Sequence, residues 1–192
     1  MSEWANLVHE LGMLARLERS GLHFLGSGRQ SVAEHSHRVA CIALILARRC
    51  KEPVDEARLA WLCLFHDLPE TRIGDHNYVN RKYLRVDMER LRADISTASP
   101  LGKTLIATID EFEQGDTLEA RLARDADQID LLALLREEAD LGNPRAEGWI
   151  RTCLERVQTP AGRELASEVL ATPADDWWFG NKHDPHWVTG KG

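Results

Sequence analysis

Apolar residues recur three and four positions apart along nearly the whole chain, and no segment shows the strict alternation of a β-strand. The loops predicted between the apolar segments are the glycine-containing residues 20–30 and the polar residues 70–80. Helices are predicted over residues 2–18, 31–50, 53–67, 81–95, 100–112, 117–141 and 144–170. The predicted fold class is therefore all-α.

Capping and helix-breaking residues predict where several of these helices begin and end. Ser31 and Glu34 have the spacing of a capping box, in which each side chain bonds the other residue's backbone N–H. Pro53 suits the first turn of the next helix, and Pro69 should stop that helix just after Asp67.

One helical domain is expected over residues 1–171, since a chain of 192 residues can bury a sizeable core. We expect residues 172–192 to form an irregular tail that packs on the domain or on a neighbouring subunit. The aromatic residues of this tail are Trp177, Trp178, Phe179 and Trp187. Apolar residues at both ends of the chain suit a homodimer, although burial within one chain explains them equally well.

Composition narrows the possible partners and the compartment. A net charge of −7 argues against binding to nucleic acid or to an acidic membrane, because no basic surface neutralises phosphates, although single arginines can still hold a small anion. No apolar run approaches the roughly 18 residues of a membrane span, and the first residues do not resemble a signal peptide. The four cysteines show no paired spacing, so reduced, buried thiols in a cytoplasmic protein are expected.

His35 and His37 lie two residues apart, so on a helix they point to nearly opposite sides. Only His35 shares its side with the apolar Val32 and Val39, which makes it the better candidate for a buried metal ligand. Considered alone, His35 is more simply explained as a core histidine that has a hydrogen-bond partner.

The doublet His66-Asp67 ends the apolar run 59–65, and Asp127 lies on an apolar helix beside Ala123. Asp125, by contrast, has Arg121 one turn earlier, so Asp127 is predicted to be the acid that points inward. Each signal is weak alone. A hydrogen bond between the two side chains at a helix end would explain His66-Asp67, and the same pair occurs at His183-Asp184 in the tail, to which we assign no function. A solvated helix face that carries three acids would explain Asp127.

Together, His35, His66, Asp67 and Asp127 form a set of two histidines and two aspartates from three helices. Mixed imidazole and carboxylate ligands suit a divalent first-row ion that keeps positions open for water and substrate. Such an ion activates water and polarises a phosphoryl oxygen, which is the chemistry of metal-assisted hydrolysis.

The order of these four residues resembles that of the HD-domain phosphohydrolases, and most of all their 5′-deoxynucleotidase branch. The resemblance runs from about residue 10 to 140 and includes the segments 14–21, 31–36 and 65–75. It implies that the four residues hold one divalent metal ion, such as Mn²⁺, Co²⁺ or Mg²⁺. Glu70 would position or activate the attacking water, Asp75 would act on the sugar or leaving-group side, and Arg19 would hold the phosphate. The alternatives are solvated loop acids and an ordinary helix-end cation.

The sequence also departs from this branch. Members of the branch often have a tryptophan shortly after the phosphate-binding arginine, and this tryptophan contacts the sugar. Here no tryptophan follows Arg19 in the stretch Gly21-Leu22-His23. Members of the wider superfamily that bind two metals have two extra histidines between the positions of Asp67 and Asp127, whereas here the only one is His76. The resemblance therefore implies a mononuclear site. We predict a phosphomonoesterase for nucleoside or deoxynucleoside 5′-monophosphates. The alternatives are a phosphodiesterase on the same scaffold and a non-enzymatic helical interaction module.

Overall fold

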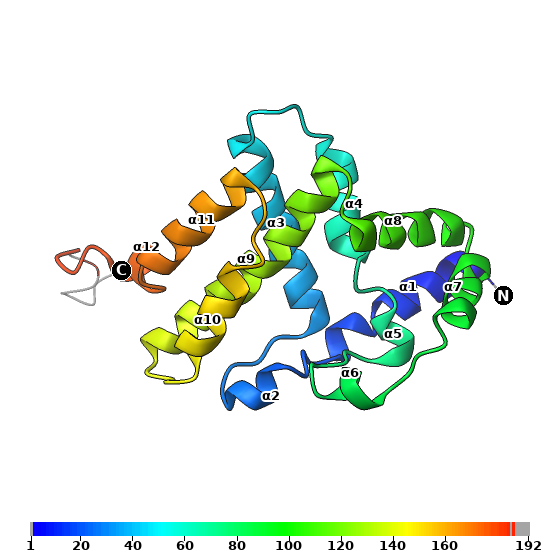
Figure 1. Ribbon diagram of the computed structural model, residues 1–192, viewed down its shortest axis with the longest axis horizontal. Helices are drawn as coiled ribbons and strands as arrows, with labels where there is room; N and C mark the ends of the chain where they lie inside the picture. The colour runs from blue at the N-terminus through cyan, green and yellow to red at the C-terminus, as the bar shows by residue number, and fades with distance from the viewer. Residues whose placement is uncertain (1, 185, 187–192) are drawn as a thin grey trace.

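The computed structural model describes residues 2–184 and 186, and within them all regular structure is helical, as predicted (Figure 1). The first half contains α1 (Glu3–Leu11), the 3₁₀ turn η1 (Leu14–Arg16), α2 (Leu22–Leu25), α3 (Val32–Arg49), α4 (Glu56–Phe65), α5 (Glu70–Ile73) and α6 (Asn80–Tyr83). The second half contains α7 (Met88–Ala98), α8 (Gly102–Gln114), α9 (Leu118–Asp140), α10 (Ala146–Leu154), α11 (Pro160–Ala171) and α12 (Asp176–Phe179).

The long helices α3 and α9 cross at the centre, and α4 packs against both (Figure 1). Their contact is filled by side chains with no exposed surface, among them Val39, Leu46, Leu62 and Ile129. Helices α10 and α11 cover one side of α9, while α7 and α8 pair at the other end over a smaller core. The central crossing places residues from α3, the end of α4 and α9 next to one another.

Local capping explains where the central helices begin. The capping box at Ser31 and Glu34 is present, and α3 follows it directly, as predicted. The prediction that Pro53 opens the next helix is wrong. Helix α4 begins at Glu56 because the carboxylate of Asp55 accepts the backbone N–H of Arg58 and so satisfies a free donor of the first turn.

The helix predicted over residues 2–18 ends at Leu11, and its apolar stripe continues into η1. Leu17 is extended, its carbonyl accepts the N–H of Val32, and Glu18 forms an isolated bridge with Ser31. These contacts hold the segment before Arg19 against the start of α3. The predicted loop 70–80 contains the single turn α5, and the helix predicted over 81–95 is split into α6 and α7.

The helix predicted over residues 144–170 is also two helices, and a buried side chain explains the break. Thr159 caps α11, and the carboxylate of Asp125 accepts the backbone N–H groups of Gln158 and Thr159 at 2.7 and 2.8 Å. Asp125 therefore satisfies donors that an uninterrupted helix would bond internally.

In the described part of the tail, α12 is one short turn, and Ala174 donates its N–H to Asp140 at 2.8 Å. Trp177 remains 87% exposed, and Trp187 lies outside the described residues. All four cysteines are free, but Cys41 is exposed, which corrects the expectation of buried thiols. None of the helices described has both the length and the apolar character needed to cross a membrane.

Candidate metal centre

Four predicted ligands, His35 from α3, His66 and Asp67 from the end of α4, and Asp127 from α9, lie together at the central crossing. Nε2 of His35 is 3.2 Å from Oδ1 of Asp127 and 3.6 Å from Oδ2 of Asp67. Nε2 of His66 is 3.2 Å from the same oxygen of Asp67. Ligand atoms of His35, His66 and Asp127 lie within 4.8 Å of one another, which is close enough to share one ion.

Both histidine rings are oriented by hydrogen bonds on the side away from this cluster. His66 Nδ1 lies 2.9 Å from the carbonyl of Cys63, and His35 Nδ1 lies 2.6 Å from Oδ2 of Asp130. A carbonyl or an ionised carboxylate can only accept, so in each ring Nδ1 carries the proton. Both Nε2 atoms are buried without a hydrogen-bond partner. This geometry fits the donor set of a divalent metal, since metal-binding imidazoles are held in this way.

The charges around the cluster favour ionised carboxylates. Burial alone would lower the pKa of His66, but its contacts with Asp67 outweigh burial and raise that pKa to about 9. Burial would raise the pKa of Asp127, but the adjacent His35 and the charge of Arg19 hold it well below its ordinary value. The carboxylates of Asp67 and Asp127, whose side chains are 22% and 24% exposed, therefore remain ionised beside two buried imidazoles, and such an arrangement attracts a cation.

His37 is exposed and contacts Cys41, so it does point away from the cluster, as predicted. Asp127 was predicted to be the acid that points inward, and it does reach the cluster, but Asp125 is fully buried as well and caps α11. The alternative of a solvated face with three acids fails for the same reason, since Asp130 is fully buried as well. Arg121 does not draw Asp125 outward; its guanidinium bonds the carbonyl of Asp116.

Arg19 and Glu70 border the cluster. Arg19 lies 4.0 Å from Oδ1 of Asp127, and although burial would lower its pKa, four carboxylates led by Asp127 raise it. Glu70 has one buried carboxylate oxygen without a hydrogen-bond partner. Burial, together with the charges of Asp67 and Asp75, raises the pKa of Glu70 to about 9. Neither residue is an ordinary solvated surface group.

Asp75 joins the loop after α5 to the segment that carries Arg19. Its Oδ2 accepts the backbone N–H of Ser20 at 2.6 Å, and its carbonyl accepts the Ser20 hydroxyl at 2.8 Å. The same hydroxyl accepts bonds from the backbone and side chain of Asn77. Asp75 therefore holds the residue next to Arg19 as well as lying near the cluster.

Comparison with known proteins identifies the family. A model described as "HD domain" matches residues 11–169, which is most of the chain. The chain belongs to the HD-domain family. The bovine protein named 5′-deoxynucleotidase HDDC2 is 26% identical over 169 residues, which cover 84% of this chain and 81% of the relative. This confirms the family predicted from the sequence and, with it, the class of hydrolases.

Solved structures share the fold. A conserved hypothetical protein from Pyrococcus furiosus superimposes with a TM-score of 0.72 at 25% identity and covers 88% of this chain and 99% of its own. A predicted metal-dependent phosphohydrolase from Magnetospirillum magnetotacticum has a TM-score of 0.68 at 24% identity, with coverage of 88% and 90%. The overall fold of the chain is thus one already seen in other proteins.

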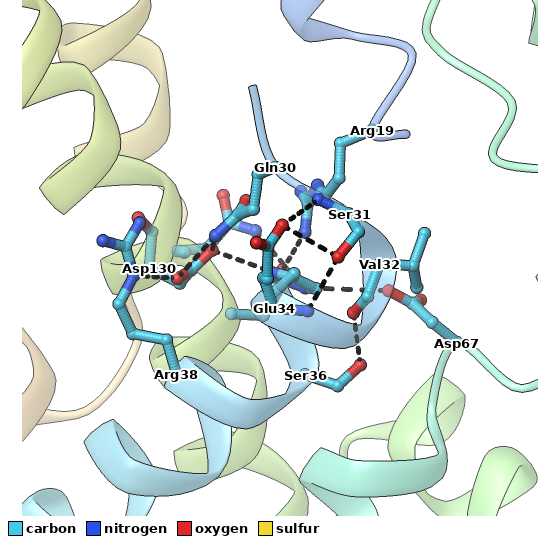
Figure 2. Close-up of polar contacts among 12 residues, drawn as sticks. Arg19, Gln30, Ser31, Val32, Glu34, Ser36, Arg38, Asp67 and Asp130 are labelled. Atoms are coloured by element: carbon cyan, nitrogen blue, oxygen red, sulfur yellow. Dashed lines mark hydrogen bonds and ion pairs between the residues drawn. The ribbon is translucent and has the colours of Figure 1, made fainter. Parts of the chain in front are cut away.

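The HD domain also contains polar residues that sequence reasoning missed. Figure 2 shows Gln30 and Arg38 converging on Asp130, on the side of α9 that faces α3. Asp130 is three residues from Asp127, which was the one available signal. Its partners are about 90 to 100 residues away in sequence, so spacing gave no indication of them.

Beside Arg19, this HD domain has a cavity of about 370 Å³. Arg19, Leu22, His23 and Gln30 line it, together with glycines 26 and 28. Both glycines have positive φ, and a Cβ at either would approach a side chain from α9 or from the start of α10. The glycines therefore let the loop that borders the cavity pack closely against α9 and α10.

Proposed function

We propose that the chain is a metal-dependent phosphomonoesterase that hydrolyses nucleoside or deoxynucleoside 5′-monophosphates to the nucleoside and phosphate. The observation that carries this proposal is the pair of buried Nε2 atoms of His35 and His66, without hydrogen-bond partners, facing the carboxylates of Asp67 and Asp127. Relatives named 5′-deoxynucleotidase support the choice of substrate.

In this proposal His35, His66, Asp67 and Asp127 hold one divalent ion. When bound, the ion polarises a phosphoryl oxygen and lowers the pKa of water next to it. Mn²⁺, Co²⁺ and Mg²⁺ are the candidates, because two imidazoles and two carboxylates accept any of them.

Arg19 binds the phosphate and stabilises the charge that develops on its oxygens. Glu70 receives the proton of the attacking water. Burial and the charges of Asp67 and Asp75 raise the pKa of Glu70, and a divalent cation held beside Asp67 would favour the ionised carboxylate that can accept this proton. Asp75 contacts the sugar side and holds Ser20, which positions Arg19. The nucleoside lies in the cavity beside Arg19.

A phosphate-release screen tests this function. Purified protein is incubated with nucleoside 5′-monophosphates, a 3′-monophosphate and a phosphodiester, each with Mn²⁺, Co²⁺, Mg²⁺ or EDTA. We expect release from the 5′-monoesters only when a metal is present. Cleavage of the diester without cleavage of any monoester would replace the proposal by a phosphodiesterase, and no cleavage at all would favour an interaction module.

We further propose that the protein acts in the cytoplasm as a homodimer, with a tail from residue 172 onward that packs on the domain or on the partner. Trp177 in this tail and Trp4 in α1 are 87% and 55% exposed, and exposed aromatic side chains of this size are common at protein interfaces. Light scattering measures the mass directly. A monomer at all concentrations would contradict this part of the proposal and leave the catalytic part intact.

A further inference from the structure

Asp130 is a fully buried carboxylate that is not among the four proposed metal ligands. It lies on α9 and accepts hydrogen bonds from three side chains that surround it. His35 Nδ1 is 2.6 Å from Oδ2, and Gln30 Nε2 is 3.1 and 3.2 Å from the two carboxylate oxygens. Arg38 donates its Nε to Oδ1 and a terminal nitrogen to the Asp130 carbonyl, as Figure 2 shows in part. A buried charge of this kind is stable only when it is paired as completely as this one.

The position of Asp130 relative to the ring of His35 indicates what it does. It bonds Nδ1, whereas Nε2 on the opposite edge faces Asp67 and Asp127. The bond therefore fixes the ring orientation and keeps the proton on Nδ1, so that the lone pair on Nε2 points toward the cluster. The ring of His66 is oriented in the same way by a hydrogen bond from its Nδ1 to the backbone carbonyl of Cys63, and no side-chain substitution can remove this carbonyl. Asp130 is thus the one of these two supports that can be altered by mutation.

We infer that Asp130 is the positioning residue of His35, and that Arg38 and Gln30 in turn hold Asp130 in place. This inference rests on the proposed metal role of His35. If the inference holds, Asp130, Arg38 and Gln30 together raise the affinity of the site for a divalent ion. Arg38 also bonds Glu137 at 2.8 Å, so its guanidinium is held at two points on α9. Gln30 additionally lines the cavity beside Arg19, so the network connects the cavity wall to a metal ligand.

The chain provides a matched control on the same helix. Asp125 is also fully buried on α9 and also accepts hydrogen bonds from three groups, but these are the backbone of Gln158 and the backbone and hydroxyl of Thr159. Asp130→Asn and Asp125→Asn therefore make the same chemical change in equally buried positions. Only the first alters a group that contacts a proposed ligand.

The experiment titrates the metal-free full-length proteins with Mn²⁺ by calorimetry. We expect Asp130→Asn to weaken Mn²⁺ binding by about 10- to 100-fold, the range found when a support of this type is lost. The amide of asparagine can turn its NH₂ group toward Nδ1 and so favour the wrong tautomer. Asp125→Asn should lower the melting temperature and leave the Mn²⁺ affinity within about twofold of wild type, because its partners lie at the cap of α11.

Nitrogen NMR of histidine-labelled protein supplies a second readout that does not depend on metal or activity. Wild-type and Asp125→Asn proteins should show His35 protonated at Nδ1, and Asp130→Asn should show a changed or mixed tautomer. If Asp130→Asn does not fold, Arg38→Met replaces it, since Arg38 is partly exposed and its loss should weaken Mn²⁺ binding less.

Three outcomes separate the claims. Unchanged Mn²⁺ affinity and an unchanged His35 tautomer in a folded Asp130→Asn protein would overturn the inference. Equal loss of affinity in Asp125→Asn would overturn it too, because the effect would then be a general loss of stability. If wild type itself does not bind Mn²⁺, the proposed function fails, and the tautomer measurement alone decides the role of Asp130.

Discussion

His35 and His37 are two residues apart on α3 and have opposite environments, which makes them a matched test of the metal assignment. We expect His35→Ala to lose bound divalent metal and phosphate release, whereas His37→Ala keeps both, because His37 is exposed. Asp67→Ala should behave like His35→Ala. Metal content by mass spectrometry and a phosphate assay measure the two effects. Loss of metal from His37→Ala alone would show that the wrong side of α3 had been chosen.

Glu70 and Arg19 border the same cluster, but their substitution should affect different kinetic constants. Glu70→Gln should keep metal and fold and lose kcat by roughly 10²- to 10⁴-fold, since its role is on the proton of water. Arg19→Ala should raise KM by about 10- to 100-fold, with a smaller loss of kcat, because it removes a charged hydrogen bond to phosphate. Steady-state kinetics on each variant separates the two. A wild-type kcat in Glu70→Gln would remove Glu70 from the mechanism.

Substrate selectivity should be weak, because no tryptophan follows Arg19 in the stretch Gly21-Leu22-His23. Leu22 is buried and packs into the main core, so it presents no aromatic surface to a sugar beside Arg19. Loose apolar contact discriminates weakly, so we predict at most a modest preference between deoxyribose and ribose 5′-monophosphates. The 3′-monophosphates should be poor substrates. The measurement is kcat/KM for deoxyadenosine 5′-monophosphate, adenosine 5′-monophosphate and adenosine 3′-monophosphate. A preference for deoxyribose above about a hundredfold, or 2.7 kcal/mol, would contradict it.

At the scale of residues, the sequence was informative where a polar group interrupts an apolar helix face. His35, His66 and Asp127 stood out for this reason, and the structure brings them together. Asp125 and Asp130 could not be sorted in the same way. Asp125 faces the cap of α11 and Asp130 faces the ring of His35. Tertiary packing alone brings each partner to its aspartate, so the local sequence does not indicate either contact.

At the scale of elements, the helical spacing predicted the type of nearly every segment, and the errors lie at helix ends. Residues 144–170 illustrate the cause. The apolar spacing continues through the break between α10 and α11, but Thr159 and Asp125 offer the backbone other hydrogen bonds there. Thr159 was recognisable as a cap before Pro160, whereas the contribution of Asp125 comes from a different helix and has no local signal.

The break before α11 can be tested through its cap. We predict that Thr159→Ala lowers the free energy of unfolding by about 1–2 kcal/mol, because the hydroxyl both accepts the N–H of Gly162 and donates to Asp125. Thr159→Ser should retain most of the stability, since its hydroxyl can make the same bonds. Urea unfolding measures the difference. Metal affinity should be unchanged in both, and a loss of metal from Thr159→Ala would mean that the α11 cap and the metal centre are coupled.

At the scale of the whole molecule, the buried charges make the stability of the metal-free protein depend on pH. The pKa of His66 is raised from 6.5 to about 9, and that of Glu70 from 4.5 to about 9. Between pH 6.5 and 9 the folded protein therefore binds protons that the unfolded chain has lost. The contribution of His66 to stability is complete below pH 6.5 and falls as pH rises toward 9. The contribution of Glu70 is complete only below pH 4.5 and falls over the wider interval from pH 4.5 to about 9. The lowered pKa of Asp127 acts only in acid, where stability falls again as this carboxylate is protonated.

A divalent metal should reverse this trend, because it competes with the proton of His66 for the same nitrogen. Metal affinity therefore rises with pH, and the stabilisation at a fixed metal concentration rises with it. We predict that the difference in unfolding free energy between samples with Mn²⁺ and with EDTA widens by more than about 1 kcal/mol from pH 6 to pH 8. Urea unfolding at pH 6, 7 and 8 measures it. In His66→Gln, which has no titrating ring, the EDTA curve should lose part of its decline and the difference should no longer grow. A constant difference in wild type would mean that metal binding displaces no proton in this range, and that His66 is not a ligand.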